Sequence, residues 1–567
     1  MEYIEAAPGK PGPIALSFSG GGFRAAAYTL GCLAYLETVQ LGGRPFLERV
    51  HFISSASGGT ITSLAYSLSQ HRAQSFITFY HQLKEQLEGS GLLKHVFDIL
   101  ENDEEWESRP YKTRNLINAF AIAYDKFLFK EATFGELFPN KQGAVPEICA
   151  NATEFSNGMQ FRFQNVGVRG NQFLHFKTST ILQQLKLADI LAASSCFTVG
   201  FEPIVYPADF HYTGLDKKAM EDDIEQDSRF SPEKDDNEGK APCFNLMDGG
   251  IDDNQGVGAF MLAEGRMQTA NGFGYHLYLA CDVSSNYSPG YTFPEENKTA
   301  PFLRPSLRTY FLIVLAVFAL SLAGILTDNL PKLASAVLGA SALVLALCLL
   351  VVYKINAAFR ASKKSGNTFG LTAIPFLSRF AKMRLSILLQ MLSSRATSTG
   401  YLAAVAYLKK IRRISYDRLF EKITEKTTGV GVEVKHWSRL AIQNALYLLS
   451  TKNNHQRLKD LRRETYVTDA IVTVMTPSAT LQKVVDVATA MDTTLWFDKN
   501  HDKEKALESL VASGAATTCY NLLRWAQRYD QQDPYWSTVV SKLSEDWNRF
   551  NDDPFWLYQE YEKQKGI

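Results

Sequence analysis

Residues 14–24 read Ile-Ala-Leu-Ser-Phe-Ser-Gly-Gly-Gly-Phe-Arg, and residues 50–59 read Val-His-Phe-Ile-Ser-Ser-Ala-Ser-Gly-Gly. Each stretch begins with a short apolar run, which is typical of a buried strand, and leads into glycines. The residues after each glycine turn, 24–41 and 58–71, read as helices. The repeated order of strand, glycine turn and helix predicts an α/β fold with a mostly parallel central sheet.

The first glycine turn, Gly20-Gly21-Gly22, suits an anion. Glycine lets backbone N–H groups face a ligand without a side chain in the way, and the helix that follows adds its dipole. The anion is either a phosphate or the oxyanion of an acyl-transfer intermediate, and the alternative is a tight turn without a ligand. The chain has no G-x-x-x-x-G-K-[ST] motif, and Ala25 stands where G-x-G-x-x-G needs its last glycine.

Ser57 lies between a strand and a helix, among small residues. This is the setting of a nucleophile elbow, in which a strained turn lifts a serine hydroxyl above the sheet. The usual G-x-S-x-G pattern is incomplete here because Ser55 replaces the first glycine. Ser54 and Ser55 are rival hydroxyls, but only Ser57 is followed directly by Gly-Gly. A turn serine without a catalytic role is the alternative.

A third motif, Asn245-Leu-Met-Asp248-Gly249-Gly250, places a carboxylate at the end of another predicted strand. Serine needs a base to accept its proton, and an aspartate within hydrogen-bond reach can serve directly. Taken alone, Asp-Gly-Gly is usually a turn. None of the ten histidines lies in the glycine turn, the Ser57 turn or the Asp-Gly-Gly segment; His51 is the nearest to Ser57, six residues earlier along the predicted strand.

The three motifs in this order resemble the patatin-like phospholipases. The resemblance implies a three-layer α/β/α fold, a catalytic dyad of Ser57 and Asp248 without histidine, and no metal or cofactor. It also implies an oxyanion hole formed by Gly20, Gly21, Gly22 and Gly58. The supporting residues that it implies are Arg24, Gly59, Gly249, Gly250 and Asn254.

The resemblance covers residues 14–285 well and the remainder loosely. Residues 146–154, 192–203 and 248–254 resemble further family stretches, although Thr198 replaces a proline of the family pattern. Residues 488–523 resemble the closing helices of the family.

Two runs in the middle of the chain, residues 310–326 and 333–353, contain no charged side chain. A membrane-spanning helix needs roughly 20 apolar residues, with a range of about 17–25. A polar segment with Pro331 separates the runs, as expected of a turn. The sequence therefore predicts an inserted transmembrane hairpin of two helices. The alternatives are two buried core helices and a hairpin that dips into the bilayer without crossing it.

Basic residues flank the hairpin on both sides, which by the positive-inside rule places both flanks in the cytoplasm. They are Arg304, Arg308, Lys354, Arg360, Lys363 and Lys364. We therefore expect an integral membrane protein, of a bacterial inner membrane, with its catalytic domain and both termini on the cytoplasmic side. Small residues within the runs allow close helix packing, including packing against a second copy as a homo-oligomer.

Three parts are expected from this pattern: a patatin-like core over residues 1–300, the hairpin over 301–355, and a mainly helical part over 356–567 that completes or covers the core. Within the core we expect helices over 78–137 and two strands within residues 145–163, around Asn151. Residues 217–240 are strongly acidic and are expected to form a surface insertion. Residues 408–416 are expected to end a helix and lead into a strand.

Composition excludes several other classes. Lys+Arg and Asp+Glu balance at 59 each, so net charge gives no reason to expect a nucleic-acid partner. The seven cysteines are far apart and form no C-x-x-C pair, which favours reduced thiols over disulfides or a zinc site.

The function expected from these features is a membrane-anchored acyl hydrolase, with membrane phospholipids as its partners, that cleaves fatty-acyl esters of glycerophospholipids or lysophospholipids. Two alternatives stay open. One is a membrane scaffold or ligand-regulated effector with little or no hydrolase activity, and the other is an acyltransferase that uses the same acyl-enzyme.

Overall fold

The computed structural model describes residues 12–40, 43–89, 91–138, 145–198, 200–227, 243–284, 291–295, 300–327, 336–347, 382–420, 441–495, 497, 499–503 and 505–565. The chain forms two compact units. The first comprises residues 1–288 and 403–567, and the second comprises residues 289–402.

The first unit is built on an eight-stranded sheet with the order β10-β9-β1-β2-β3-β8-β6, in which β4 also pairs with β3. The strands β1, β2, β3, β9 and β10 are parallel, whereas β4 and β8 run antiparallel to β3, and β6 antiparallel to β8. The strands are β1 (Ile14–Phe18), β2 (Val50–Ala56), β3 (Glu147–Glu154), β4 (Met159–Gln164), β6 (Ile204–Tyr206), β8 (Phe244–Asp248), β9 (Leu277–Asp282) and β10 (Ala441–Ala445). The predicted mostly parallel sheet is confirmed.

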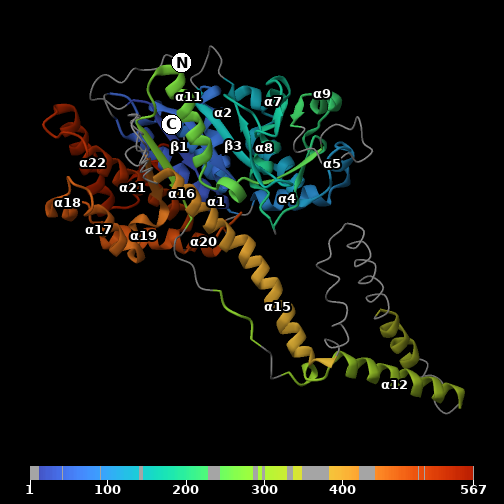
Figure 1. Ribbon diagram of the computed structural model, residues 1–567. Helices are drawn as coiled ribbons and strands as arrows, with labels where there is room; N and C mark the ends of the chain where they lie inside the picture. The colour runs from blue at the N-terminus through green and yellow to red at the C-terminus, as the bar shows by residue number, and fades with distance from the viewer. Residues whose placement is uncertain are drawn as a thin grey trace, which may run out of the picture. The chain divides into compact units, whose positions relative to one another are not determined.

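Helices cover both faces of this sheet (Figure 1). Side chains alternate along a strand, so that Leu16 and Phe18 join the larger core cluster while Ala15 joins the smaller one. The larger cluster contains residues of α1 (Gly22–Thr38), α2 (Gly58–His71), α8 (Leu187–Ser195) and α21 (Ala506–Ala526). The smaller one contains residues of α11 (Val257–Asn271) and α16 (Tyr407–Phe420). The result is the predicted α/β/α arrangement.

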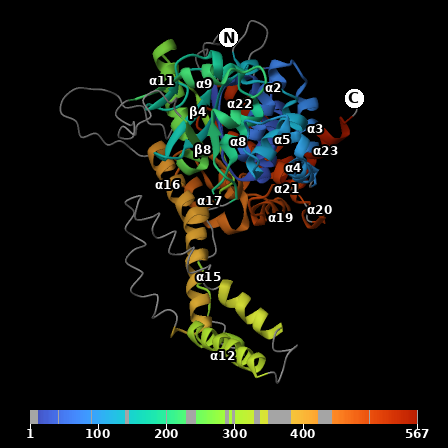
Figure 2. The same cartoon turned by 90° about the vertical axis from the view of Figure 1, so that its right-hand side faces the viewer.

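The C-terminal helices complete the larger core cluster of the first unit. Helices α1 and α21 approach so closely that a Cβ atom on Gly31 would lie 2.0 Å from the Val511 carbonyl oxygen. Figure 2 shows the C-terminal helix α23 (Trp556–Lys563) beside α3 (Phe76–Leu87). There, the rings of Tyr80 and Tyr561 stack at 4.6 Å, and Lys84 bonds Glu562 at 3.0 Å. The remaining C-terminal helices are α17 (Asn454–Leu461), α18 (Asp469–Val474), α19 (Ala479–Ala490), α20 (Lys499–Lys503) and α22 (Pro534–Asp552).

Residues 76–129 are mainly helical, as predicted. They form α3, α4 (Gly91–Glu101), α5 (Asp103–Glu107), α6 (Leu116–Ala123) and a π-helix over Tyr124–Phe129. A small separate sheet pairs β5 (Leu174–Phe176) with β7 (Ile224–Gln226).

The two strands predicted within residues 145–163 are β3 and β4. Asn151 lies inside β3, and the turn between the strands comes later, where Glu154 accepts hydrogen bonds from Ser156 and Asn157. One local prediction needs correction. Residues 408–416 lie within α16, whose buried residues Arg412, Ser415 and Leu419 recur at helical spacing. The predicted acidic surface insertion begins with a helix, α9 (Lys217–Asp222), in which Met220 is the one buried residue and whose N-terminus the Asp216 side chain caps. Residues 228–242 lie outside the described residues.

The second unit contains α12 (Leu307–Leu326), with a mean hydropathy of 2.5 over a window of which only 6% is buried. By length and composition, α12 is the one helix among the described residues that could cross a membrane. Its exposed apolar surface does not fit the alternative of a buried core helix. Within the second predicted run, only the shorter apolar helix Ala336–Leu347 is described, and the rest lies outside the described residues. The unit ends with α15 (Leu385–Tyr401).

Candidate active site

The sheet register brings the three sequence motifs to one level. Ala56, the last residue of β2, pairs with Asn151 on β3, and the next β3 residue, Ala152, pairs with Asp248 on β8. Ser57 and Asp248 therefore lie on either side of β3 at nearly the same height. On the other side of β2, Phe18 pairs with Ser55, so the glycine turn after β1 lies beside the Ser57 turn.

Ser57 occupies the strained backbone expected of a nucleophile elbow. Its φ is 50° and its ψ −124°, a conformation that non-glycine residues rarely adopt. Helix α2 begins at the next residue, Gly58. The side chain is 9% exposed, which makes it more accessible than its two rivals.

Ser54 and Ser55 are fully buried, and both hydroxyls are held by neighbours. The Ser54 hydroxyl accepts a hydrogen bond from the Asn151 amide at 2.9 Å. The Ser55 hydroxyl accepts from Thr60 at 3.1 Å and from Ser63 at 2.7 Å. A serine in place of the usual glycine thus ties β2 to the start of α2 and leaves the elbow intact.

Ser194, in the last turn of α8, holds the elbow and the Asp248 turn together. Its carbonyl oxygen accepts the N–H groups of Ser57 at 3.0 Å and Gly249 at 3.1 Å. Its hydroxyl lies 3.1 Å from the Ser57 nitrogen and donates to the Asn151 carbonyl at 2.7 Å. Sequence reasoning assigned no role to Ser194 or Asn151, although both lie in stretches that resemble the family pattern.

Asp248 lies at the end of β8 and is only 3% exposed. Burial raises the pKa of its carboxyl from 3.8 to about 6, while hydrogen bonds from the Gly250 N–H and the Ser57 side chain pull the pKa down. The Gly250 bond to the Asp248 Oδ1 is 2.7 Å long. Gly249 leaves space for β3, because a Cβ atom there would lie 2.2 Å from the Asn151 carbonyl oxygen. The hydrogen bond from the Ser57 side chain places the two predicted catalytic residues, Ser57 and Asp248, in contact.

The glycine turn packs directly against the elbow. A Cβ atom on Gly20 would lie 3.1 Å from the Ser57 Cβ, and one on Gly58 only 2.0 Å from the Gly22 carbonyl oxygen. The N–H groups of Gly21, Gly22 and Gly58 bond no acceptor within the part of the chain that the structure describes. Two of them open helices, where the first N–H groups have no partner within the helix.

Gly20 differs from the other predicted oxyanion donors. Its N–H is already used, by the Asn254 side-chain oxygen at 3.1 Å and the Asn254 carbonyl at 3.2 Å. Gly20 and Asn254 therefore fix the conformation of the glycine turn. The N–H groups of Gly21, Gly22 and Gly58 remain as free donors among the described residues. Gly59 has a packing role, since a Cβ atom there would lie 2.5 Å from the Phe18 carbonyl oxygen.

Arg24 fixes the glycine turn to the C-terminal part of the chain. Its guanidinium donates to the Met491 carbonyl. Nearby, the Phe23 N–H donates to the Thr494 carbonyl at 2.7 Å. Burial lowers the pKa of Arg24, and the charges of Asp492 and Asp282 partly oppose that shift. Residues 491–494 thus close over the turn, which the sequence alone did not indicate.

Close packing of Gly58 against Gly22 leads to a prediction for Gly58→Ala. The added methyl group would overlap backbone atoms that cannot rotate away, so the elbow and the glycine turn must separate. We expect at least about a 100-fold lower rate of Ser57 acylation, the effect of losing one oxyanion donor. Gly265→Ala is the matched control, because a Cβ atom there meets nothing within 4 Å on α11. It should keep full activity and stabilise the helix slightly; equal behaviour of the two variants in rate and thermal unfolding would contradict the prediction.

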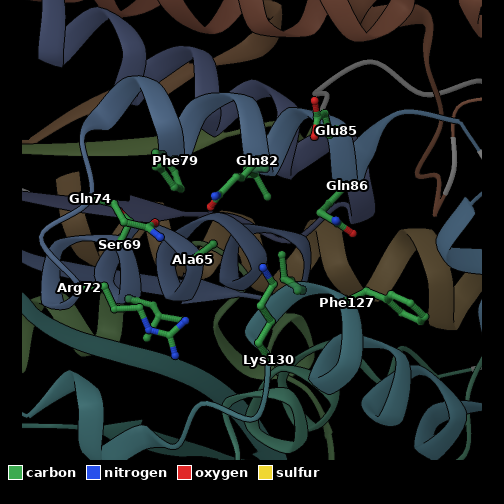
Figure 3. Close-up of a pocket in the computed structure, with 13 residues that line it drawn as sticks. Ala65, Ser69, Arg72, Gln74, Phe79, Gln82, Glu85, Gln86, Phe127 and Lys130 are labelled. Carbon is green, nitrogen blue, oxygen red and sulfur yellow. The ribbon is translucent and has the colours of Figure 1, made fainter. Parts of the chain in front are cut away.

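A cavity of about 340 Å³ lies at the far end of α2 (Figure 3). Residues of α2, α3 and the π-helix line it, together with Arg72, Gln74 and Lys130. Its nearest α2 residue, Ala65, is about 12 Å from Ser57 at 1.5 Å per helical residue. The cavity therefore has no part in chemistry at Ser57. Among the described residues, no group of three His, Cys, Asp or Glu side chains is placed to hold a metal ion.

Part of the chain matches a known protein family. Residues 16–261 match the sequence pattern of the family described as patatin-like phospholipase. A search of curated protein sequences finds no match. Similar solved structures include human GIVD cytosolic phospholipase A2, with 13% identity, a TM-score of 0.31, and coverage of 48% of this chain and 45% of that chain. They also include VipD from Legionella pneumophila, with 13% identity, a TM-score of 0.23, and coverage of 56% of each chain. This chain thus spans about half the length of the solved structures that it matches, and its residues 16–261 are a domain of the patatin-like phospholipase family.

Proposed function

We propose that this protein is a membrane-anchored serine acyl hydrolase that cleaves fatty-acyl esters of glycerophospholipids or lysophospholipids. The observation that carries the proposal is the contact between Ser57, in its strained elbow, and the buried Asp248, beside three unused backbone N–H groups. These are the nucleophile, base and oxyanion donors that ester hydrolysis requires.

In the proposed reaction, Asp248 accepts the Ser57 proton while the Ser57 Oγ attacks the acyl carbonyl carbon. The N–H groups of Gly21, Gly22 and Gly58 stabilise the oxyanion of the tetrahedral intermediate. The ester bond then breaks, Asp248 returns its proton to the leaving alkoxide, and an acyl-enzyme remains. Water attacks the acyl-enzyme with Asp248 again as base, which releases the fatty acid and restores Ser57.

The membrane part of the proposal is supported by α12, with its mean hydropathy of 2.5, and by the uncharged run over 333–353. We propose that the two runs span a bacterial inner membrane as a hairpin with both flanks cytoplasmic, since basic residues flank them on both sides. An enzyme anchored there meets phospholipid at high local concentration. Extraction of the full chain by alkaline carbonate would contradict this anchoring.

A fluorophosphonate probe tests the enzymatic part directly. Full-length protein in detergent should be labelled, and mass spectrometry should place the adduct on the peptide that contains Ser57. Analysis of lipid products then separates free fatty acid, the hydrolase product, from a newly acylated acceptor, the transferase product. Folded protein that takes up no label would instead favour a scaffold or effector without catalysis.

The raised pKa of Asp248 predicts an acid limb in the pH profile. Asp248 must be deprotonated to act as base, so kcat/KM should fall about tenfold per pH unit below its pKa of about 6. The measurement is hydrolysis of a soluble ester between pH 4.5 and 8, with folding followed by circular dichroism. A profile that is flat through pH 5 while the protein stays folded would exclude Asp248 as the base.

A further inference from the structure

Asp282 is a buried carboxylate at the end of β9, next to the glycine turn. The strand lies beside β1, and the Ser19 N–H donates to the Cys281 carbonyl at 3.0 Å. Asp282 is fully buried, as expected only for a charge that is well paired.

Its partner is Arg412 on α16, whose Nε donates to the Asp282 Oδ2 at 2.7 Å. Tyr416, one turn further along α16, donates to the same oxygen at 3.0 Å. The Arg412 Nη2 donates to the Tyr447 hydroxyl at 3.1 Å, and its guanidinium lies over both tyrosine rings. Burial would raise the pKa of Asp282, but the Arg412 charge and these bonds hold it below its usual value. The pair is therefore ionised inside the fold.

A continuous chain of hydrogen bonds leads from Asp282 to the glycine turn. The Asp282 Oδ1 accepts the Ser284 N–H at 2.8 Å. The Ser284 hydroxyl accepts from the Asn254 Nδ2 at 3.3 Å, and the Asn254 Oδ1 accepts from the Gly20 N–H at 3.1 Å. Val283 adds a packing contact, since a Cβ atom on Gly21 would lie 2.6 Å from its methyl carbon. A shift of Asp282 would thus move both sides of the turn.

Helix α16 follows the second unit directly in the chain. The second unit ends at Leu402, and the helical path continues from α15 through a π-helix, Leu402–Ala406, into α16. Insertions of this π type are frequent at functional sites and are a common cause of helix bending. Arg412 is therefore the point at which α16, which follows the second unit in the chain, bonds the strand that supports the proposed oxyanion hole.

We propose that Asp282 and Arg412 are positioning residues that hold the glycine turn in its oxyanion-binding shape and make that shape depend on the placement of α16. The inference rests on the proposed function of the Ser57 site and adds its control by the membrane-linked helix. An ion pair suits this role because its strength depends steeply on geometry in a dry interior. The proposal also predicts that the charges of Asp282 and Arg412 must balance, since either charge without the other is costly in the buried interior.

The test compares Arg412→Gln with Arg413→Gln, the adjacent exposed arginine of α16. Full-length protein in detergent is reacted with a fluorophosphonate, and the labelling rate constant is measured together with kcat and KM for a soluble ester. Arg412→Gln should lower the labelling rate constant and kcat at least about tenfold with little change in KM, because a displaced oxyanion donor acts mainly on the transition state. Arg413→Gln should behave as wild type.

A second variant separates positioning from simple destabilisation. The double variant Asp282→Asn/Arg412→Gln replaces the ion pair by two neutral amides, and it should regain most of the lost rate. Three outcomes would overturn the proposal: folded Arg412→Gln with the wild-type rate constant, a smaller labelled fraction at an unchanged rate constant, or no recovery in a folded double variant. Absence of Ser57 labelling in wild type would overturn the proposed function as well, whereas a labelled wild type with any of these outcomes overturns the coupling alone.

Discussion

Ser57→Ala is expected to abolish fluorophosphonate labelling and to reduce ester hydrolysis by about 10⁴–10⁶-fold, the range typical for loss of a serine nucleophile. The fold should survive, because within the described residues the Ser57 hydroxyl bonds only the Asp248 carboxyl. Alanine accepts the strained backbone at φ 50° no worse than serine does. The measurement is labelling and hydrolysis of the purified full-length variant, with thermal unfolding as the check on folding.

Ser55→Ala is the matched control, since Ser55 lies two residues away and was a rival nucleophile. Its loss removes the acceptor for Thr60 and Ser63 in the core, so we expect lower stability but persistent labelling at Ser57. Labelling that survives in Ser57→Ala and disappears in Ser55→Ala would show that Ser55, and not Ser57, is the nucleophile.

Asp248→Asn is expected to separate activity from stability. It removes the base that accepts the Ser57 proton, so kcat should fall about 10³–10⁴-fold, while the side-chain oxygen can still accept the Gly250 N–H. Thermal unfolding at pH 7 should occur at a higher temperature than in wild type. An aspartate kept ionised despite burial destabilises the fold, and the asparagine carries no charge.

The sign of this stability change follows from the pKa. The Asp248 carboxyl has a pKa of about 6 when folded and 3.8 as an unperturbed group. Between these values the folded state holds a proton that the unfolded state has lost, so the unfolding free energy of wild type falls as pH rises from about 4 to 6. At pH 7 the loss is about 3 kcal/mol, from a pKa difference of about 2.2 units at 1.36 kcal/mol per unit, and Asp248→Asn should recover much of it. The gap should close below pH 4, and a gap that is independent of pH would contradict this account.

Asp253→Asn provides the contrast. Burial raises the pKa of Asp253 to about 6 as well, but its two oxygens accept the N–H groups of Val257 and Gly258 at the start of α11. An amide offers one acceptor in place of two, so this variant should lose stability and keep Ser57 labelling. Loss of labelling in both variants to the same degree would show that neither carboxyl is specific to the reaction.

The local pattern of the sequence predicted most of the fold. Short apolar runs before glycines identified β1 and β2, and the helical spacing of apolar residues after them identified α1 and α2. Such local prediction works because the spacing of apolar residues along a strand or helix follows the side that is buried. The prediction was wrong for residues 408–416, where a dense basic run concealed the buried side of α16. Strands as short as β6 and β10 gave no local signal, since their pairing depends on distant partners.

Local sequence patterns predicted the parts of the candidate site: a serine in a strained turn between a strand and a helix, a glycine turn, and a carboxylate at a strand end. It could not determine their distances, because Ser57 and Asp248 meet only through the pairing of β2 and β8 on either side of β3. Tertiary structure alone decided that Gly20 donates to Asn254, that Ser194 holds both turns, and that Arg412 bonds Asp282. These contacts join residues at least 130 positions apart, except Ser194 and Gly249, which are 55 positions apart, and no local period encodes such pairs. Their physical cause is the same: buried polar groups must find partners wherever the packed chain supplies them.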